Sequence, residues 1–165
     1  MRGLEDKDVD IINVHKARQY ALKLLSYRGR SERELEGRLR QKGFPENVVS
    51  STIRYLKHAG LIDDRALAEA LKREAMTTKL LSQYSAKILM LNRGIPKEIA
   101  NSMFILNGEN EDMANAEKLV EKKLRSIKNL SEEKINRRLY NLLLRRGYSY
   151  DTIKGVLKKK NLKEG

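Results

Sequence analysis

The sequence predicts an all-α protein, an elongated and curved array of three tandem three-helix repeats. The first reason is composition, since 35% of the 165 residues are charged and only two are proline, a balance typical of helical chains. The second is a glycine-centred pattern that recurs after 51 and then 53 residues. The third is the apolar residues four and eight positions before each glycine, which fall on one helix face.

The recurring pattern is a basic residue, a glycine and a large apolar residue. It appears as Lys42-Gly43-Phe44, Arg93-Gly94-Ile95 and Arg146-Gly147-Tyr148. The basic residue complements the negative end of the helix dipole, the glycine accepts a left-handed conformation, and the apolar residue packs back on the helix. Pro45 and Pro96 suit the first turn of the helix that follows. Each repeat therefore contains a helix, a tight turn and a second helix, and an alanine-rich helix precedes this pair.

Residues 1–62 are expected to form an N-terminal extension and the first repeat. Ser31 and Glu34 make a capping box there, in which the serine hydroxyl accepts from the Glu34 amide and the carboxylate reaches back. Residues 63–108 form the expected second repeat, whose first helix is capped by Asp63. Asn107-Gly108 is the loosest connection, and it leads into the expected third repeat, residues 109–165, in which Ser131 opens a helix.

Positive charge is concentrated toward the two ends of the chain. The formal charge of +13 divides into +4 for residues 1–65, zero for residues 66–113 and +9 for residues 114–165. Such a distribution favours polyanion contact at the ends over simple solvation of helix faces, although lysine and arginine commonly do the latter.

Two basic clusters are the candidate contact residues for a protein partner or DNA. The N-terminal basic cluster is Arg28, Arg30, Arg33, Arg38, Arg40 and Lys42. Internal pairing of Glu34 with Arg38 and of Glu36 with Arg40 is as good an interpretation of this cluster as a contact surface. The C-terminal basic cluster is Arg137, Arg138, Arg145, Arg146, Lys154, Lys158, Lys159 and Lys160. Three interspersed tyrosines, Tyr140, Tyr148 and Tyr150, either stack on bases or pack at the edge of a thin core.

The sequence lacks the patterns that enzymes, metal sites and membrane proteins use. His15 and His58 stand alone, cysteine is absent, and no glycine-rich phosphate loop occurs. Asp63-Asp64 is better explained by helix capping than by paired catalytic carboxylates. We therefore expect no catalysis, no cofactor and no metal. The absence of a membrane-length apolar run or a secretory signal predicts a cytoplasmic protein.

The segment from Ser31-Glu32-Arg33-Glu34-Leu35 to Lys42-Gly43-Phe44, followed by Gly60-Leu61-Ile62-Asp63-Asp64, resembles the RecX family of RecA regulators. The Arg93-Gly94-Ile95-Pro96 and Arg146-Gly147-Tyr148 segments resemble its second and third repeats. The resemblance implies a non-enzymatic protein that binds the filament of RecA recombinase on single-strand DNA and mostly inhibits its ATPase, assembly and recombination activities. It implies roles in DNA repair, recombination and the SOS response, weak non-specific contact with single-strand DNA, and a monomeric state.

Two other classes of protein remain compatible with the sequence. Residues 31–62 read like a helix-turn-helix core, so a DNA-binding repressor or adaptor would place helix 45–58 in the major groove. That helix carries few donors, and two further repeats have no obvious use in a repressor. A purely structural helical scaffold is the other alternative, and the basic C-terminal third argues against it.

Overall fold

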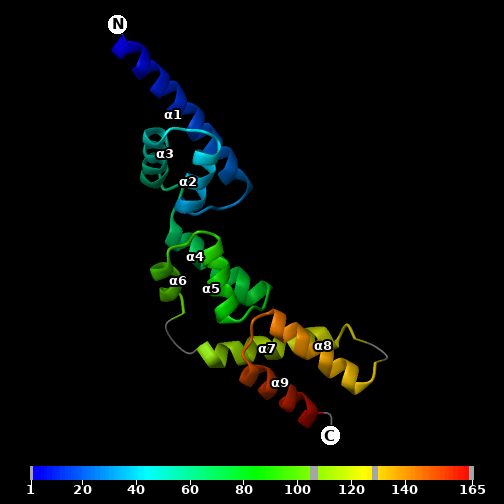
Figure 1. Ribbon diagram of the computed structural model, residues 1–165. Coiled ribbons are helices and arrows are strands. Elements are labelled where there is room, and N and C mark those ends of the chain that lie inside the picture. Colours follow the sequence, from blue (N-terminus) through cyan, green and yellow to red (C-terminus); the bar gives the residue numbers. More distant parts are fainter. Residues whose placement is uncertain (1, 105–107, 128–129, 164–165) are drawn as a thin grey trace. The chain divides into compact units, whose positions relative to one another are not determined.

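The computed structural model of the chain describes residues 2–104, 108–127 and 130–163 (Figure 1). The helices within these ranges are α1 (Arg2–Tyr27), α2 (Glu32–Gln41), α3 (Glu46–His58), α4 (Asp64–Arg73), the π-helix η1 (Glu74–Thr78), α5 (Gln83–Asn92), α6 (Lys97–Ser102), α7 (Gly108–Leu124), α8 (Glu132–Arg145) and α9 (Tyr150–Lys163). The described ranges contain no strand. The predicted all-α repeat fold is therefore confirmed. Asn107, part of the expected connection, lies outside the described residues, and Gly108 begins a helix instead of a loop.

The chain divides into two compact units, and the second repeat is shared between them. The first unit contains Met1–Ala68 and Leu91–Ile99, and the second unit contains Glu69–Met90 and Ala100–Gly165. The repeat boundaries after residues 62 and 108 stay predictions at the level of sequence.

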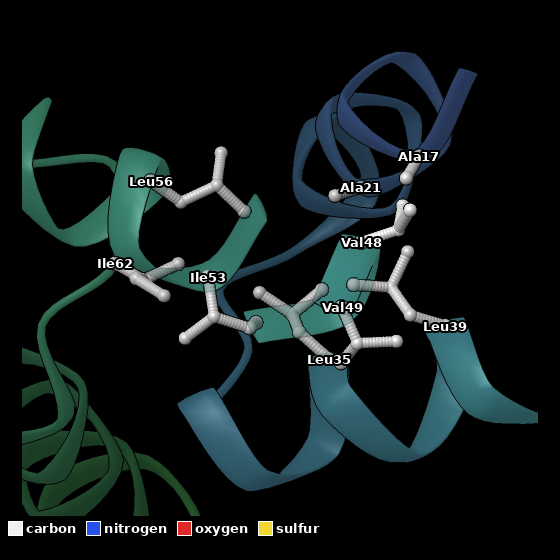
Figure 2. Close-up of a cluster of buried hydrophobic side chains, with 9 residues drawn as sticks. All are labelled: Ala17, Ala21, Leu35, Leu39, Val48, Val49, Ile53, Leu56 and Ile62. Carbon is white, nitrogen blue, oxygen red and sulfur yellow. The ribbon is translucent and has the colours of Figure 1, made fainter. Parts of the chain in front are cut away.

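The core of the first unit lies where α1, α2 and α3 pack against one another (Figure 2). Alanines on α1 let it approach closely, and the larger side chains come from α2 and α3. The buried residues are Ala17, Ala21, Leu35, Leu39, Val48, Val49, Ile53, Leu56 and Ile62. Each helix contributes residues at the three- and four-residue spacing of an amphipathic helix, so the sequence pattern is the direct cause of this core.

The second unit packs α7, α8 and α9 around its main core. The buried residues are Leu80, Ala116, Leu119, Val120, Leu139, Leu143, Tyr148, Ile153 and Val156. A smaller cluster is formed by Ala75 and Met76 of η1 and by Ala86 of α5. Ala116 on α7 is a small buried residue like the alanines of α1, but α7 also buries Leu119 and Val120.

The glycine turns have the predicted geometry. Gly43 and Gly147 have φ angles of 91° and 83°. The Phe44 amide donates to the Leu39 carbonyl at 3.2 Å, and the Tyr148 amide likewise donates to the helix it has just left. This bond across the turn is the signature of a Schellman helix end. Pro45 occupies the N-cap position of α3 instead of its first turn, with φ −61° and ψ 153°.

A joint between repeats lies within the first unit. Ser31, the N-cap of α2, accepts from the Glu34 amide at 3.1 Å and donates its hydroxyl to the Arg93 carbonyl at 2.7 Å. The Arg93 guanidinium donates to the Gly29 carbonyl at 2.8 Å. Gly94 has φ 80°, and a Cβ on it would lie 2.5 Å from the Ser31 hydroxyl oxygen. The turn of the second repeat thus closes on the serine cap of the first, and only glycine fits there.

A second joint lies within the second unit, and it also brings a serine that precedes a helix together with an arginine-glycine turn. The Ser82 amide donates to the Arg146 carbonyl at 3.0 Å, and the Arg146 guanidinium donates to the Lys79 carbonyl. The Ser82 hydroxyl accepts from the Ser85 amide at 3.1 Å. A Cβ on Gly147 would lie 2.9 Å from that hydroxyl oxygen. Because each joint fastens an arginine-glycine turn to the preceding repeat, different segments of the second repeat belong to different units.

A half-buried aspartate completes each joint. Asp64 accepts from the Glu32 amide, and Asp112 from the Gln83 amide, both at 2.9 Å. Glu32 and Gln83 each follow the serine of their joint. Burial raises the pKa of both aspartates, against the opposing effect of the amide hydrogen bonds. The role of these two carboxylates in joining repeats was not predicted from the sequence.

Candidate interaction surfaces

Three members of the N-terminal basic cluster form ion pairs inside the first unit. The Arg28 guanidinium donates to the Glu34 carboxylate at 3.0 Å, and Arg30 contacts the same carboxylate. Burial favours the protonated form of Glu34, but hydrogen bonds and charge from Arg28 and Arg30 outweigh it and lower the pKa. The expected Glu34–Arg38 pair is wrong, and so is the reach of the Glu34 carboxylate back to the cap. Arg40 bridges Glu36 at 3.4 Å, as predicted, and Glu46 at 2.7 Å.

The remaining members of this cluster are exposed. Lys42 lies over the ring of Tyr20, with its ammonium 5.8 Å from the ring centroid. Arg33 and Arg38 project from α2, and neither forms an ion pair with any residue that the structure describes. The sequence indicated six basic residues as candidate contacts, and the structure therefore leaves a smaller contact surface than all six would make.

The C-terminal basic cluster is also divided by the fold. Arg137, Arg138 and Arg145 are exposed along α8. Arg146 is half-buried and belongs to the second joint, where its guanidinium reaches the Lys79 carbonyl. A long-range backbone hydrogen bond thus fixes its side chain, and its role as a contact residue stays a prediction.

The lysines of α9 have three different environments. Lys154 and Lys158 are exposed. Lys159 pairs with Glu117 at 2.6 Å. Lys160 is only 7% exposed, and its ammonium donates to the Asn136 side chain at 3.3 Å. Lys160 is thus buried in the second unit, which leaves little of its side chain available for contact with a partner.

The three tyrosines separate into one core residue and two exposed rings. Tyr148 is 3% exposed, and its hydroxyl donates to the Leu80 carbonyl at 2.9 Å. Burial raises the pKa of the Tyr148 phenol well above its ordinary value. The packing interpretation therefore holds for Tyr148, which is not available to a base. Tyr140 and Tyr150 remain 37% and 64% exposed.

These two exposed rings border a groove between α8 and α9, which we call the tyrosine groove. Its volume is about 540 Å³. The lining residues are Asn136 and Tyr140 from α8, and Tyr150, Ile153, Lys154, Leu157 and Lys158 from α9. The tyrosines and lysines were predicted from the sequence, whereas the apolar floor that Ile153 and Leu157 provide was not. Ile153 and Leu157 are four residues apart, as are the adjacent Lys154 and Lys158. That helical spacing is the sequence signal that both pairs lie along one side of α9.

The described residues offer no site for a metal ion or a membrane span. No group of three or more histidine and carboxylate side chains within them is arranged to hold a metal. Nor does any described helix have the length and apolarity needed to cross a bilayer.

Comparisons with known proteins agree with the repeat geometry. Residues 17–56 match the model of the first three-helix domain of RecX, and residues 109–157 match the model of the third. Regulatory protein RecX of Amycolatopsis mediterranei is 33% identical over 148 residues, which is 87% of this chain and 84% of that protein. Regulatory protein RecX of Clostridium botulinum is 29% identical over 96% of this chain and 73% of its own length.

A solved structure shows the same fold. The crystal structure of RecX from Lactobacillus salivarius has a TM-score of 0.73 and 28% sequence identity, and the match covers 92% of this chain and 99% of that one. The two matched domain models fall on the two units' main cores, α1–α3 and α7–α9. Together, these similarities extend over nearly the whole sequence, and the chain belongs to the RecX family of regulatory proteins.

Proposed function

We propose that this protein binds the RecA filament on single-strand DNA and mostly inhibits its ATPase, its assembly and its recombination activity. Membership in the RecX family carries the proposal, because RecA regulation is what the resemblance to that family implies. The exposed arginines of α8 support it, since a guanidinium suits bidentate contact with the carboxylates of a protein or the phosphates of DNA.

The proposed mechanism needs no chemistry. A protein that binds one state of a filament better than another shifts the equilibrium between the states by its difference in affinity. Several weak contacts on linked repeats add to one another through effective concentration. We accordingly propose a non-enzymatic, monomeric protein that acts in the cytoplasm, where its filament forms, and that binds naked single-strand DNA weakly and without sequence preference.

The alternative of a helix-turn-helix repressor gains little from the first unit. Its recognition helix would be α3, whose Lys and Arg residues are few. Lys57 already pairs with Glu32 at 2.8 Å, and the Arg18 guanidinium covers the Tyr55 ring at 4.0 Å. Arg54 is left as an exposed base on this helix. A recognition helix commonly presents three or four side chains to base edges, so the filament proposal is favoured.

The decisive experiment measures RecA ATP hydrolysis on single-strand DNA while this protein is added at increasing concentration. We expect hydrolysis to fall at micromolar concentration or below. An unchanged rate across that range would contradict the proposed function.

The contact surface is tested by replacing Arg137, Arg138 and Arg145 with alanine. We expect weaker inhibition, because three exposed charges on α8 are removed. The matched control replaces Lys118, Lys122 and Arg125 with alanine, which removes the same charge from α7 and the residue after it. Equal inhibition by both variants would remove α8 from the proposed surface, and circular dichroism checks that both stay helical.

A further inference from the structure

We propose that the tyrosine groove binds a single-stranded polynucleotide, with Tyr140 and Tyr150 stacking on bases and Lys154 and Lys158 holding phosphates. The inference rests on the proposed function, which it deepens by naming a site and a mode of binding. Net charge alone places polyanion contact somewhere in the C-terminal third of the chain. The proposal places that contact in one groove of the second unit.

The helical spacing of the lining residues makes the groove linear. Tyr150, Lys154 and Lys158 follow one another at four-residue intervals, so they lie along one side of α9 about 6 Å apart. Asn136 and Tyr140 have the same spacing on α8. A strand lying between the helices would meet an aromatic ring on each wall and two positive charges in series. An extended chain of alternating bases and phosphates matches that arrangement.

The aromatic rings are exposed where the core does not need them. Tyr148 shows how this fold uses a structural tyrosine, with a buried ring and a bonded hydroxyl. Tyr150 keeps most of its ring in solvent, beside a floor that includes the buried Ile153. Rings above an apolar floor offer π-faces to any base, so stacking in this groove would be strong without selecting a sequence.

The charge of the groove selects a polyanion. Neither Lys154 nor Lys158 forms an ion pair with any described residue, whereas the adjacent Lys159 is held by Glu117. Among the described residues that line the groove, none is acidic. A neighbouring groove between α7 and α9 has mixed charge, because Glu117 and Glu121 line it together with Lys159 and Lys160. A third groove, lined by Lys79, Lys122, Lys123 and Arg146 among others, is basic but has no aromatic ring among its described lining residues. Of these three grooves, the tyrosine groove is therefore the one that offers a nucleic-acid strand both positive charge and rings for stacking.

The test measures binding of fluorescein-labelled oligothymidine to the full chain without RecA. A double variant, Tyr140→Leu with Tyr150→Leu, keeps apolar bulk but removes both rings. We expect its affinity to fall by roughly fivefold or more for each ring, as removal of base stacking commonly does. The control is Tyr84→Leu, which changes an exposed tyrosine of the same unit outside the groove and should bind like the unaltered chain.

An abasic oligonucleotide of equal length separates stacking from charge. The unaltered chain should bind it more weakly than oligothymidine, and the double tyrosine variant should bind both strands equally. Lys154→Gln with Lys158→Gln should weaken both strands and lower the dependence of affinity on salt. Oligouridine in a parallel titration distinguishes RNA from DNA, and tighter binding of either strand through the tyrosines supports the site.

Three outcomes would overturn the proposal. One is equal binding of oligothymidine by the double tyrosine variant and the unaltered chain, and another is equal binding of abasic and normal strands by the unaltered chain. The third is no binding of any strand while the tyrosine variant loses RecA inhibition, which would assign the groove to a protein. Because the titration contains no RecA, a failure to bind DNA would leave the filament proposal standing. The ATPase experiment tests that proposal separately.

Discussion

At the scale of single residues, Gly43 and Gly94 share a left-handed backbone but differ in their surroundings. A Cβ on Gly43 would meet nothing within 4 Å, whereas one on Gly94 would collide with the Ser31 hydroxyl. The sequence shows both residues in the same pattern, so it cannot tell the exposed turn from the turn inside a joint. That distinction comes from Ser31, which lies 63 positions before Gly94 in the sequence.

We predict that Gly43→Ala destabilises the protein by about 1–2 kcal/mol, the cost of holding an L-residue in the left-handed region. Gly94→Ala should cost about 1 kcal/mol more, because the new methyl group also displaces the Ser31 cap. Urea unfolding followed by circular dichroism measures the difference. Equal unfolding midpoints for the two variants would show that the first joint tolerates a methyl group.

The half-buried carboxyl of Asp112 should make stability depend on pH. Burial raises its pKa in the folded state above the ordinary value of 3.8, so the folded state holds the proton to higher pH than the unfolded chain does. The stabilising contribution is therefore complete at low pH and is lost as pH rises through the raised pKa.

Asp112→Asn should remove this pH-dependent loss, because the amide oxygen can still accept from the Gln83 amide while nothing ionises. Urea midpoints from about pH 4 to pH 7 should fall less steeply for this variant than for the unaltered chain. Asp151→Asn, at an exposed position on α9, serves as the control and should follow the unaltered chain. Parallel profiles for Asp112→Asn and the unaltered chain would contradict the assignment.

At the scale of elements, two serines at helix starts have different roles. Ser31 caps α2 and also holds the Arg93 carbonyl, while Ser131 opens α8 with no side-chain capping bond. Both positions were predictable from sequence as helix starts, since each precedes acidic residues in a first turn. The second bond of Ser31 was not predictable, because its acceptor belongs to another repeat.

Ser31→Ala should destabilise the protein by about 1–2 kcal/mol, since the Glu34 amide and the partly buried Arg93 carbonyl both lose their partner. Ser131→Ala should change stability by less than about 0.5 kcal/mol, as most exposed substitutions do. Thermal unfolding of the two variants provides the comparison. A similar loss in both would mean that the helix-start position, and not the joint, accounts for the effect.

At the scale of the whole molecule, charge is the property that the sequence described best and the structure refined most. The +9 of residues 114–165 was evident from counting. Folding half-buries Arg146, buries Lys160 and pairs Lys159 with Glu117. The bases of the C-terminal cluster that remain exposed and unpaired among the described residues are Arg137, Arg138 and Arg145 on α8 and the two lysines of the tyrosine groove.

The location of polyanion contact gives a prediction at this scale. Arg137→Gln with Arg138→Gln should weaken binding to naked single-strand DNA and lower the salt slope by about 0.7 for each phosphate that is no longer neutralised. Arg33→Gln with Arg38→Gln removes the same charge from exposed positions of the first unit. Oligonucleotide binding at several salt concentrations compares them. A larger effect from the α2 pair would place the DNA contact in the first unit.

The amino-acid sequence was sufficient to predict the helices, the left-handed glycine turns and the unequal charge of the repeats, because local spacing and backbone sterics decide these features. Tertiary packing decided that the second repeat is shared between two units, because the joints unite Ser31 with Arg93 and Ser82 with Arg146. Tertiary packing also decided which basic residues and which tyrosines remain exposed. Those outcomes depend on partners more than 60 residues away, which no local periodicity records.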